Sequence, residues 1–321
     1  MTTITIKTDI ISLINQRMAD PLTRTDDLNI TLLVQLLACE MATGDTQTQT
    51  LHVKGIQRMV ELRGGSLRLS LNSEITFVTA CLILYFCVLN ELQTPSNYLD
   101  FLSVAMSRTA PLRQYLFESP VFCLYEDFIV VLRSENYPTY LYDLLYDMCD
   151  LTEMFLYRHN CTKHIAAIAN SNRTNAFDGG KTYSRTTDYE LRAAEIQRRL
   201  ITRPAANTSN NPVSGDWAYE CIRLTALIYT TALLRCTPFS VAAPLTTDPY
   251  TSTPSIIKSL GAALIKAYKY SCWADMPGCL LWVGVVGGAA ARPARDECRN
   301  QEDDMARMWL AMVAIGCSLK R

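Results

Sequence analysis

The sequence predicts an all-α fold, and three observations support this prediction. Apolar residues recur every three or four positions in several stretches, such as residues 48–63, which is the period of a helix with one buried face. Residues typical of helix ends border these stretches, as Gly64 and Gly65 do here. A sustained alternation of apolar and polar residues, typical of strands, is not found in the sequence. We therefore expect a multi-helix bundle or array.

The domain prediction follows the same patterns along the chain. Residues 1–28 are rich in Thr and Asp and weakly patterned, so we expect a weakly structured N-terminal segment. Residues 29–321 are expected to form a single helical domain, without an internal repeat of solenoid type. The expected helices cover about residues 29–44, 48–63, 75–92, three or four segments within 97–169, and then 189–201, 217–234, 255–268 and 277–291.

Three stretches between these helices are polar and contain glycine or proline. They lie at about residues 170–188, 203–216 and 238–253. Such composition is typical of loops, since it offers no apolar face to bury. We expect all three to be mobile.

The stretch from Ser271 to Ala291 is the most apolar in the chain. Asp275 is placed to cap a helix that carries Pro277 in its first turn. From Leu280 to Ala291 no residue is charged, and a helix that is apolar on all sides lies in a core or in a membrane. The uncharged run is about a dozen residues, whereas a bilayer needs about 20. We expect a buried, Gly-rich central helix near the C-terminus.

Composition narrows the class of protein. The 321 residues are 49% hydrophobic and 19% charged, with a net charge of −1, which is typical of a globular chain. A stand-alone DNA-binding domain is usually basic, so we expect no direct DNA binding by this chain. The twelve cysteines are expected to be free thiols in a reducing compartment. The first residues do not have the pattern of a signal peptide, so a cytoplasmic or nuclear location is expected.

Three blocks of sequence together resemble the fungal-specific transcription factor domain. This is the helical regulatory region that follows the DNA-binding zinc cluster in many fungal regulators. The blocks are HVKGIQRMVELRGG, CIRLTALIYTTALLR, and CWADMPGCLLWVGVVGGAAA with a later RMWL. The residues that carry the resemblance, and whose role it implies to be mainly structural, are His52, Arg63, Gly64, Gly65, Arg223, Trp273, Pro277, Trp282 and Trp309.

The resemblance implies a nuclear regulator of RNA polymerase II transcription that is not an enzyme. Its partners would be other transcription regulators or coactivators, and a small-molecule effector. The zinc cluster of the family needs paired Cys-x-x-Cys units, and this sequence contains none. We therefore expect no metal or other cofactor and no membrane partner, and contact with DNA only through another protein.

Residues 115–157 are rich in aromatic side chains, which gives two interpretations. They could form a surface or pocket for a partner or effector, for which the candidates are Tyr115, Tyr125, Tyr137, Tyr140 and Tyr146. They could instead form a Tyr-rich core between helices, which composition alone favours. The alternative function is accordingly an all-α small-molecule-binding protein or enzyme with an aromatic pocket within residues 97–157.

Charged residues at helical spacing occur in two further places. Asp147, Asp150 and Glu153 share one predicted helix, and Arg192, Arg198, Arg199 and Arg203 share another with glutamates interleaved. Such sets are typical of solvated helix faces. We expect neither set to form a metal site or a nucleic-acid surface.

Overall fold

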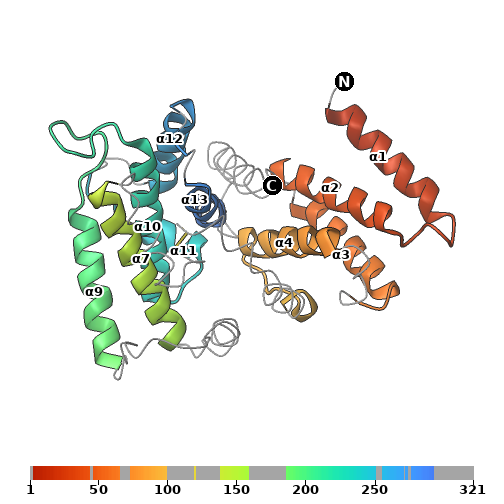
Figure 1. Cartoon of the computed structure of the whole chain (residues 1–321), viewed down its shortest axis with the longest axis horizontal. Helices are drawn as coiled ribbons and strands as arrows, with labels where there is room; N and C mark the ends of the chain where they lie inside the picture. The colour runs from red at the N-terminus through yellow and green to blue at the C-terminus, as the bar shows by residue number, and fades with distance from the viewer. Residues whose placement is uncertain are drawn as a thin grey trace, which may run out of the picture. The chain divides into compact units, whose positions relative to one another are not determined.

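The computed structural model describes residues 3–43, 46–65, 73–99, 119–120, 138–158, 186–250, 255–270, 272–273 and 276–292. Every regular element within these ranges is a helix (Figure 1), which confirms the all-α prediction. The contacts group into two compact units, residues 1–108 and 109–321, called here the N-terminal and C-terminal units. This differs from the single domain expected over residues 29–321.

The N-terminal unit is built around one apolar helix. It contains α1 (Thr3–Met18), α2 (Asp27–Thr43), α3 (Thr46–Leu62) and α4 (Ser73–Leu89). Helix α2 contacts the other three. Its Ile30 and Leu37 are fully buried, as are Ile56 of α3 and Ile83 of α4. Because burial of apolar surface is the main stabilising term in folding, α2 holds this unit together.

Helix α1 corrects the prediction of a weakly structured N-terminal segment. Ile14 is buried, and Lys7 Nζ lies 2.8 Å from Glu40 Oε1 of α2. Arg17 Nε donates to Asn29 Oδ1 at 3.2 Å. These contacts with α2 stabilise a helix whose own sequence has a weak pattern, since most helical stability comes from tertiary packing.

The C-terminal unit is built around α10 (Trp217–Arg235). The other helices are α7 (Thr139–Arg158), α9 (Thr186–Thr202), α11 (Phe239–Leu245), α12 (Ile256–Lys269) and α13 (Pro277–Ala290). Helix α10 contacts all five of them, and every residue from Ala218 to Ala232 is buried. Asp216 caps its start by accepting the Tyr219 N–H at 3.0 Å. The core of this unit therefore surrounds α10 (Figure 1).

Helix α13 is buried, as its uncharged sequence predicts. Only Val285 is partly exposed between Gly278 and Ala290, and the helix packs on α10, α11 and α12. Pro277 opens it, but the N-cap is Met276, which makes no side-chain capping bond. The expected cap, Asp275, lies outside the described residues. Within this unit, α10 and not α13 is the helix that contacts every other described helix. The sequence of α10 contains charged residues, so its burial was not predicted.

Two of the three expected loops differ from the prediction of mobile segments. Within residues 203–216, Ala205, Ala206 and Val213 are buried, and the Gly215 N–H donates to the Ala206 carbonyl at 2.9 Å. Residues 238–253 include helix α11. Residues 203–216 and 238–250 make contacts with α10 and its neighbours, which local composition does not reveal. Of the third stretch, residues 170–185 lie outside the described residues and 186–188 begin α9.

Candidate functional site

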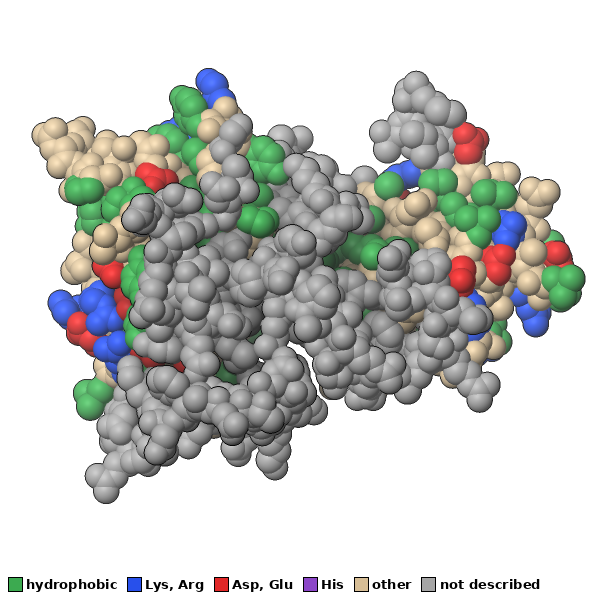
Figure 2. Space-filling model, viewed as in Figure 1, with side chains coloured by type: hydrophobic (Ala, Val, Ile, Leu, Met, Phe, Trp, Pro, Cys, Tyr) green, Lys and Arg blue, Asp and Glu red, His purple; other side chains and the backbone are tan. Residues whose placement is uncertain are grey.

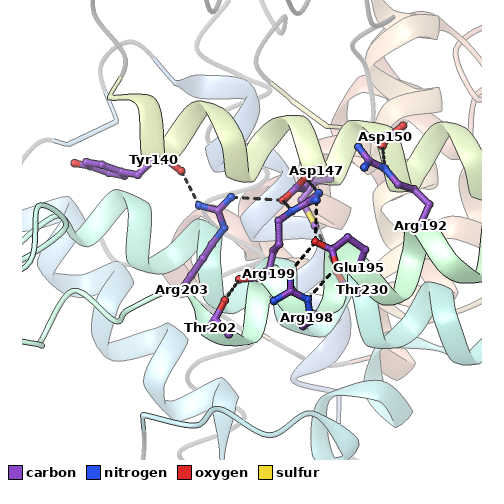
Figure 3. Close-up of polar contacts among 11 residues, drawn as sticks. Tyr140, Asp147, Asp150, Arg192, Glu195, Arg198, Arg199, Thr202, Arg203 and Thr230 are labelled. Carbon is purple, nitrogen blue, oxygen red and sulfur yellow. Dashed lines mark hydrogen bonds and ion pairs between the residues drawn. The ribbon is translucent and has the colours of Figure 1, made fainter.

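A cluster of charged side chains joins α7 to α9 in the C-terminal unit (Figure 3). Asp147 and Asp150 of α7 are 5% and 2% exposed. The guanidinium of Arg192 donates from Nε to Asp150 Oδ2 at 2.9 Å. Arg199 pairs with Asp147, and Arg203 Nη2 lies 3.5 Å from Asp147 Oδ2. We call these five residues the α7–α9 ionic seam.

The seam corrects the expectation that both charged sets lie on solvated faces. Each helix turns part of its charged face toward the other, because the adjacent positions Leu144, Met148 and Ile196 belong to the buried core. Arg198 is 67% exposed, and Glu195 and Arg192 are each 38% exposed. Figure 2 shows acidic and basic side chains together along α9. The sequence had not indicated that the two sets meet.

The chemistry of the seam is that of a clamp between helices. The hydrogen bond that Arg192 donates to Asp150 outweighs burial and raises the pKa of Arg192, so this guanidinium keeps its charge. Asp150 accepts the hydrogen bond from Arg192, and Asp147 is paired with both Arg199 and Arg203. The seam therefore positions α7 against α9 and leaves neither aspartate placed as an open acid or base.

A second ionic cluster lies inside the unit, around Arg223 of α10. Arg223 is fully buried and forms two hydrogen bonds with Glu220, at 2.8 and 3.0 Å, and two with Asp248, at 3.2 and 3.3 Å. Glu220 also accepts the Ala206 N–H at 3.0 Å. The ring of Tyr250 lies 5.6 Å from the guanidinium carbon. This cluster fastens residues 203–216 and the segment after α11 to the central helix.

The described tyrosines of the aromatic region pack against the core. Tyr140 is half-buried, donates its hydroxyl to Asp216 Oδ2 at 2.8 Å and meets the ring of Tyr219 edge-on at 5.3 Å. Burial and then this hydrogen bond raise the pKa of Tyr140. Tyr146 is half-buried and stacks on Tyr142 at 6.0 Å. Tyr115, Tyr125 and Tyr137 lie outside the described residues, so the proposed aromatic surface stays a prediction.

The described residues of the resemblance have structural positions. Gly64 and Gly65 follow α3 with φ of 91° and 96°, a conformation that favours glycine. Arg63 pairs with Asp27 at the start of α2, and His52 is half-buried on α3. The remaining members, Trp273 and Trp282, are buried in the C-terminal unit, Pro277 opens α13, and Trp309 lies outside the described residues.

A pocket of about 120 Å³ opens between α9, α10 and the end of α11. Its lining includes Gln197, Leu227, Thr230, Arg235 and Thr246, and none of its lining residues is aromatic. Pockets for drug-sized ligands measure about 300–1,000 Å³. This pocket has room for a few water molecules or a very small solute, and it is not the aromatic pocket of the alternative function.

The candidate functional site is one side of α12. Its opposite side, with Ile257, Leu260, Leu264 and Ala267, is buried in the core. The outer side carries large apolar side chains, of which Ile265 is 61% and Tyr270 63% exposed. We define the α12 face as Ala262, Ile265, Lys266, Tyr268, Lys269 and Tyr270, all of which are exposed.

The α12 face is positively charged. Lys258, Lys266 and Lys269 are the charged residues of the helix, which contains no acidic residue. The ammonium of Lys266 lies 3.7 Å from the ring centre of Trp217, and that of Lys269 lies 5.9 Å from the ring centre of Tyr270. Figure 2 shows basic and hydrophobic side chains together at the projecting end of α12. This face was not predicted from the sequence, although Ile265 is a large apolar residue on the same side of the predicted helix as Lys258 and Lys269, which is a signal that the sequence contains.

Two findings concern metal binding and membrane crossing by the described residues. In the ranges that the structure describes, no group of three His, Cys, Asp or Glu side chains is arranged to hold a metal ion. No single helix there is both long and apolar enough to cross a membrane; α10 and α11 reach that length only as a pair bent by 109°. The described cysteines are free thiols: Cys39, Cys81, Cys87, Cys149, Cys221, Cys236, Cys272 and Cys279.

Comparison of the chain with protein-family models, with curated proteins and with solved structures found no match. The resemblance to the fungal regulatory domain therefore rests on the three sequence blocks alone.

Proposed function

We propose that this chain is a regulatory interaction module in RNA polymerase II transcription, which acts in the nucleus by binding another protein. The three blocks of the resemblance suggest the biological setting. The α12 face is the single structural observation that supports the mode of action. The partner would be another transcription regulator or a coactivator.

The α12 face has the properties of a binding surface on a fixed scaffold. Large exposed apolar side chains gathered in one place mark interaction sites more often than isolated ones do, and aromatic residues are enriched at interfaces. The helix beneath is anchored by Leu260 and Leu264, both fully buried. Such a face can bind a partner without first having to fold.

Contact with DNA is proposed to be indirect. The chain has a net charge of −1, and the basic residues of the ionic seam are paired with aspartates. Tight binding of the isolated chain to duplex DNA, weakening steeply with salt, would contradict this part of the proposal.

A tethering experiment tests the function. The chain is fused to a heterologous DNA-binding domain, and output is measured from a reporter gene that carries the matching site. We expect output to change several-fold relative to the DNA-binding domain alone, and Ile265→Asp to abolish the change. Leu191→Asp is the matched control, because Leu191 of α9 is 72% exposed and lies outside the α12 face. Unchanged output from the well-expressed fusion under all nutrient conditions tested would refute the proposal.

A further inference from the structure

We propose that the occupant of the α12 face is an acidic amphipathic helix of a partner protein. This inference rests on the proposed function, because it specifies which partner chemistry the same surface accepts.

The exposed residues form a stripe rather than a scatter. Ala262, Ile265, Tyr268 and Lys269 lie at intervals of three and four residues, which places them along one side of α12. Ala262 is small, and Ile265, one turn further along the helix, is large. The stripe is therefore lower at Ala262, where a ridge of partner side chains can pack. A helix that packs against α12 would bury Ile265 and the ring of Tyr268.

The charge of the face selects the sign of the partner. Lys258, Lys266 and Lys269 lie along the helix without an acidic residue between them. Asp216, an acidic residue just before α10, accepts hydrogen bonds from the Tyr219 N–H and the Tyr140 hydroxyl. A partner with carboxylates beside its apolar residues would pair with the lysines and gain both in association rate and in specificity.

The size of the face favours a helix over other anionic partners. The face runs from Ala262 to Tyr270, about 12 Å along the helix axis, which matches about two turns of a partner helix. Clusters that bind anionic membranes contain about four to eight basic residues, and DNA-binding surfaces make several phosphate contacts. Three lysines around exposed Ile265 and Tyr270 suit an apolar, acidic peptide better than they suit an anionic membrane or DNA.

A binding experiment with designed peptides tests the inference on the full-length chain. The probe is a fluorescent helical peptide about 15 residues long, with Leu at positions i, i+4 and i+7 and Glu beside them. A peptide of the same composition in scrambled order is its control. We expect saturable binding of the first peptide by fluorescence anisotropy, and binding at least about tenfold weaker of the second.

Matched variants locate the binding. Ile265→Asp and Lys269→Glu should each weaken binding by about tenfold, whereas Leu191→Asp and Lys54→Glu, exposed positions on α9 and α3, should leave it unchanged. For a peptide in which Lys replaces Glu, the order should reverse: the Lys269→Glu variant should bind it more tightly than the wild-type chain does. Circular dichroism melting of each variant checks that the fold is kept.

Three outcomes overturn the inference. The first is that the acidic peptide does not bind, and the second is that the α12 variants bind it as well as the control variants do. The third is that the chain binds anionic vesicles or duplex DNA more tightly than the peptide, and that the α12 variants lose this binding. Each is distinguishable from failure of the proposed function. A chain that alters the reporter but does not bind the peptide has a different partner chemistry, and a chain that binds the peptide but leaves the reporter unchanged is an interaction module outside transcription.

Discussion

Arg223 and Glu220, one turn apart on α10, are paired inside the core. Arg223 Nη2 donates to Glu220 Oε1 at 2.8 Å, and its Nε donates to Glu220 Oε2 at 3.0 Å. Burial alone would lower the pKa of Arg223, but the hydrogen bonds and charges of Glu220 and then Asp248 outweigh it and raise the pKa. The guanidinium is thus charged, fully buried and bonded on both sides. This pair lets a helix with two buried charged residues lie at the centre of the unit.

Removing the cation of this cluster should be costly. Arg223→Ala leaves the carboxylates of Glu220 and Asp248 buried without a counter-charge, so the free energy of unfolding should fall by about 3–5 kcal/mol. Urea unfolding followed by circular dichroism measures it. The triple variant Arg223→Met, Glu220→Leu, Asp248→Leu should recover part of the loss, because it removes all three charges together. A single variant as stable as the wild type would contradict the account.

The α7–α9 ionic seam makes a second prediction. Asp147→Asn should lower the free energy of unfolding by about 2–3 kcal/mol, because a buried partner of Arg199 and Arg203 loses its charge. Asp143→Asn makes the same change at an exposed position of α7 and should stay within about 0.5 kcal/mol of wild type. Equal effects of the two substitutions in urea unfolding would show that the seam does not stabilise the unit.

Trp282 of α13 tests the importance of that helix. Its ring meets Tyr229 of α10 edge-on at 5.4 Å, and Trp282→Ala should cost about 3–5 kcal/mol, as for other buried aromatic residues. The indole N–H of Trp282 has no hydrogen-bond partner among the described residues, so Trp282→Phe should cost far less, about 1 kcal/mol. Thermal unfolding compares the two, and a melting temperature unchanged by Trp282→Ala would refute the burial of α13.

His52 predicts a pH dependence of the N-terminal unit. Burial lowers the pKa of His52; the charge of Glu40 opposes this shift and that of Lys7 adds to it. Because the ordinary His pKa of about 6.5 applies to the unfolded chain, that chain binds more protons than the folded one below this pH. The contribution to stability is therefore present above about pH 6.5 and is lost as the pH falls through the folded pKa.

The measurement is a comparison with His52→Gln. As the pH falls from about 7.5 to about 5.5, the wild type should lose more unfolding free energy than the variant does, since Gln does not titrate in this range. Parallel pH profiles of the two proteins would contradict the prediction.

The sequence by itself determined the helical class and most helix positions. The apolar period of residues 48–63 and the Gly64-Gly65 stop correspond to α3, and the uncharged run after Pro277 corresponds to buried α13. These features are local, because a helix closes its own hydrogen bonds and records its buried side in its spacing. Local patterns were sufficient for them.

Only the tertiary structure decided which helix is central, which loops are ordered and which charges are buried. The sequence of α10 shows Glu220 and Arg223 but does not show that Asp248 meets them. Asp147 and Arg199 are 52 residues apart, and each had been read as part of a solvated face. Whether a charged side chain faces water or a partner depends on which helices pack together, so the α12 face and the ionic seam are properties of the fold and not of any segment within it.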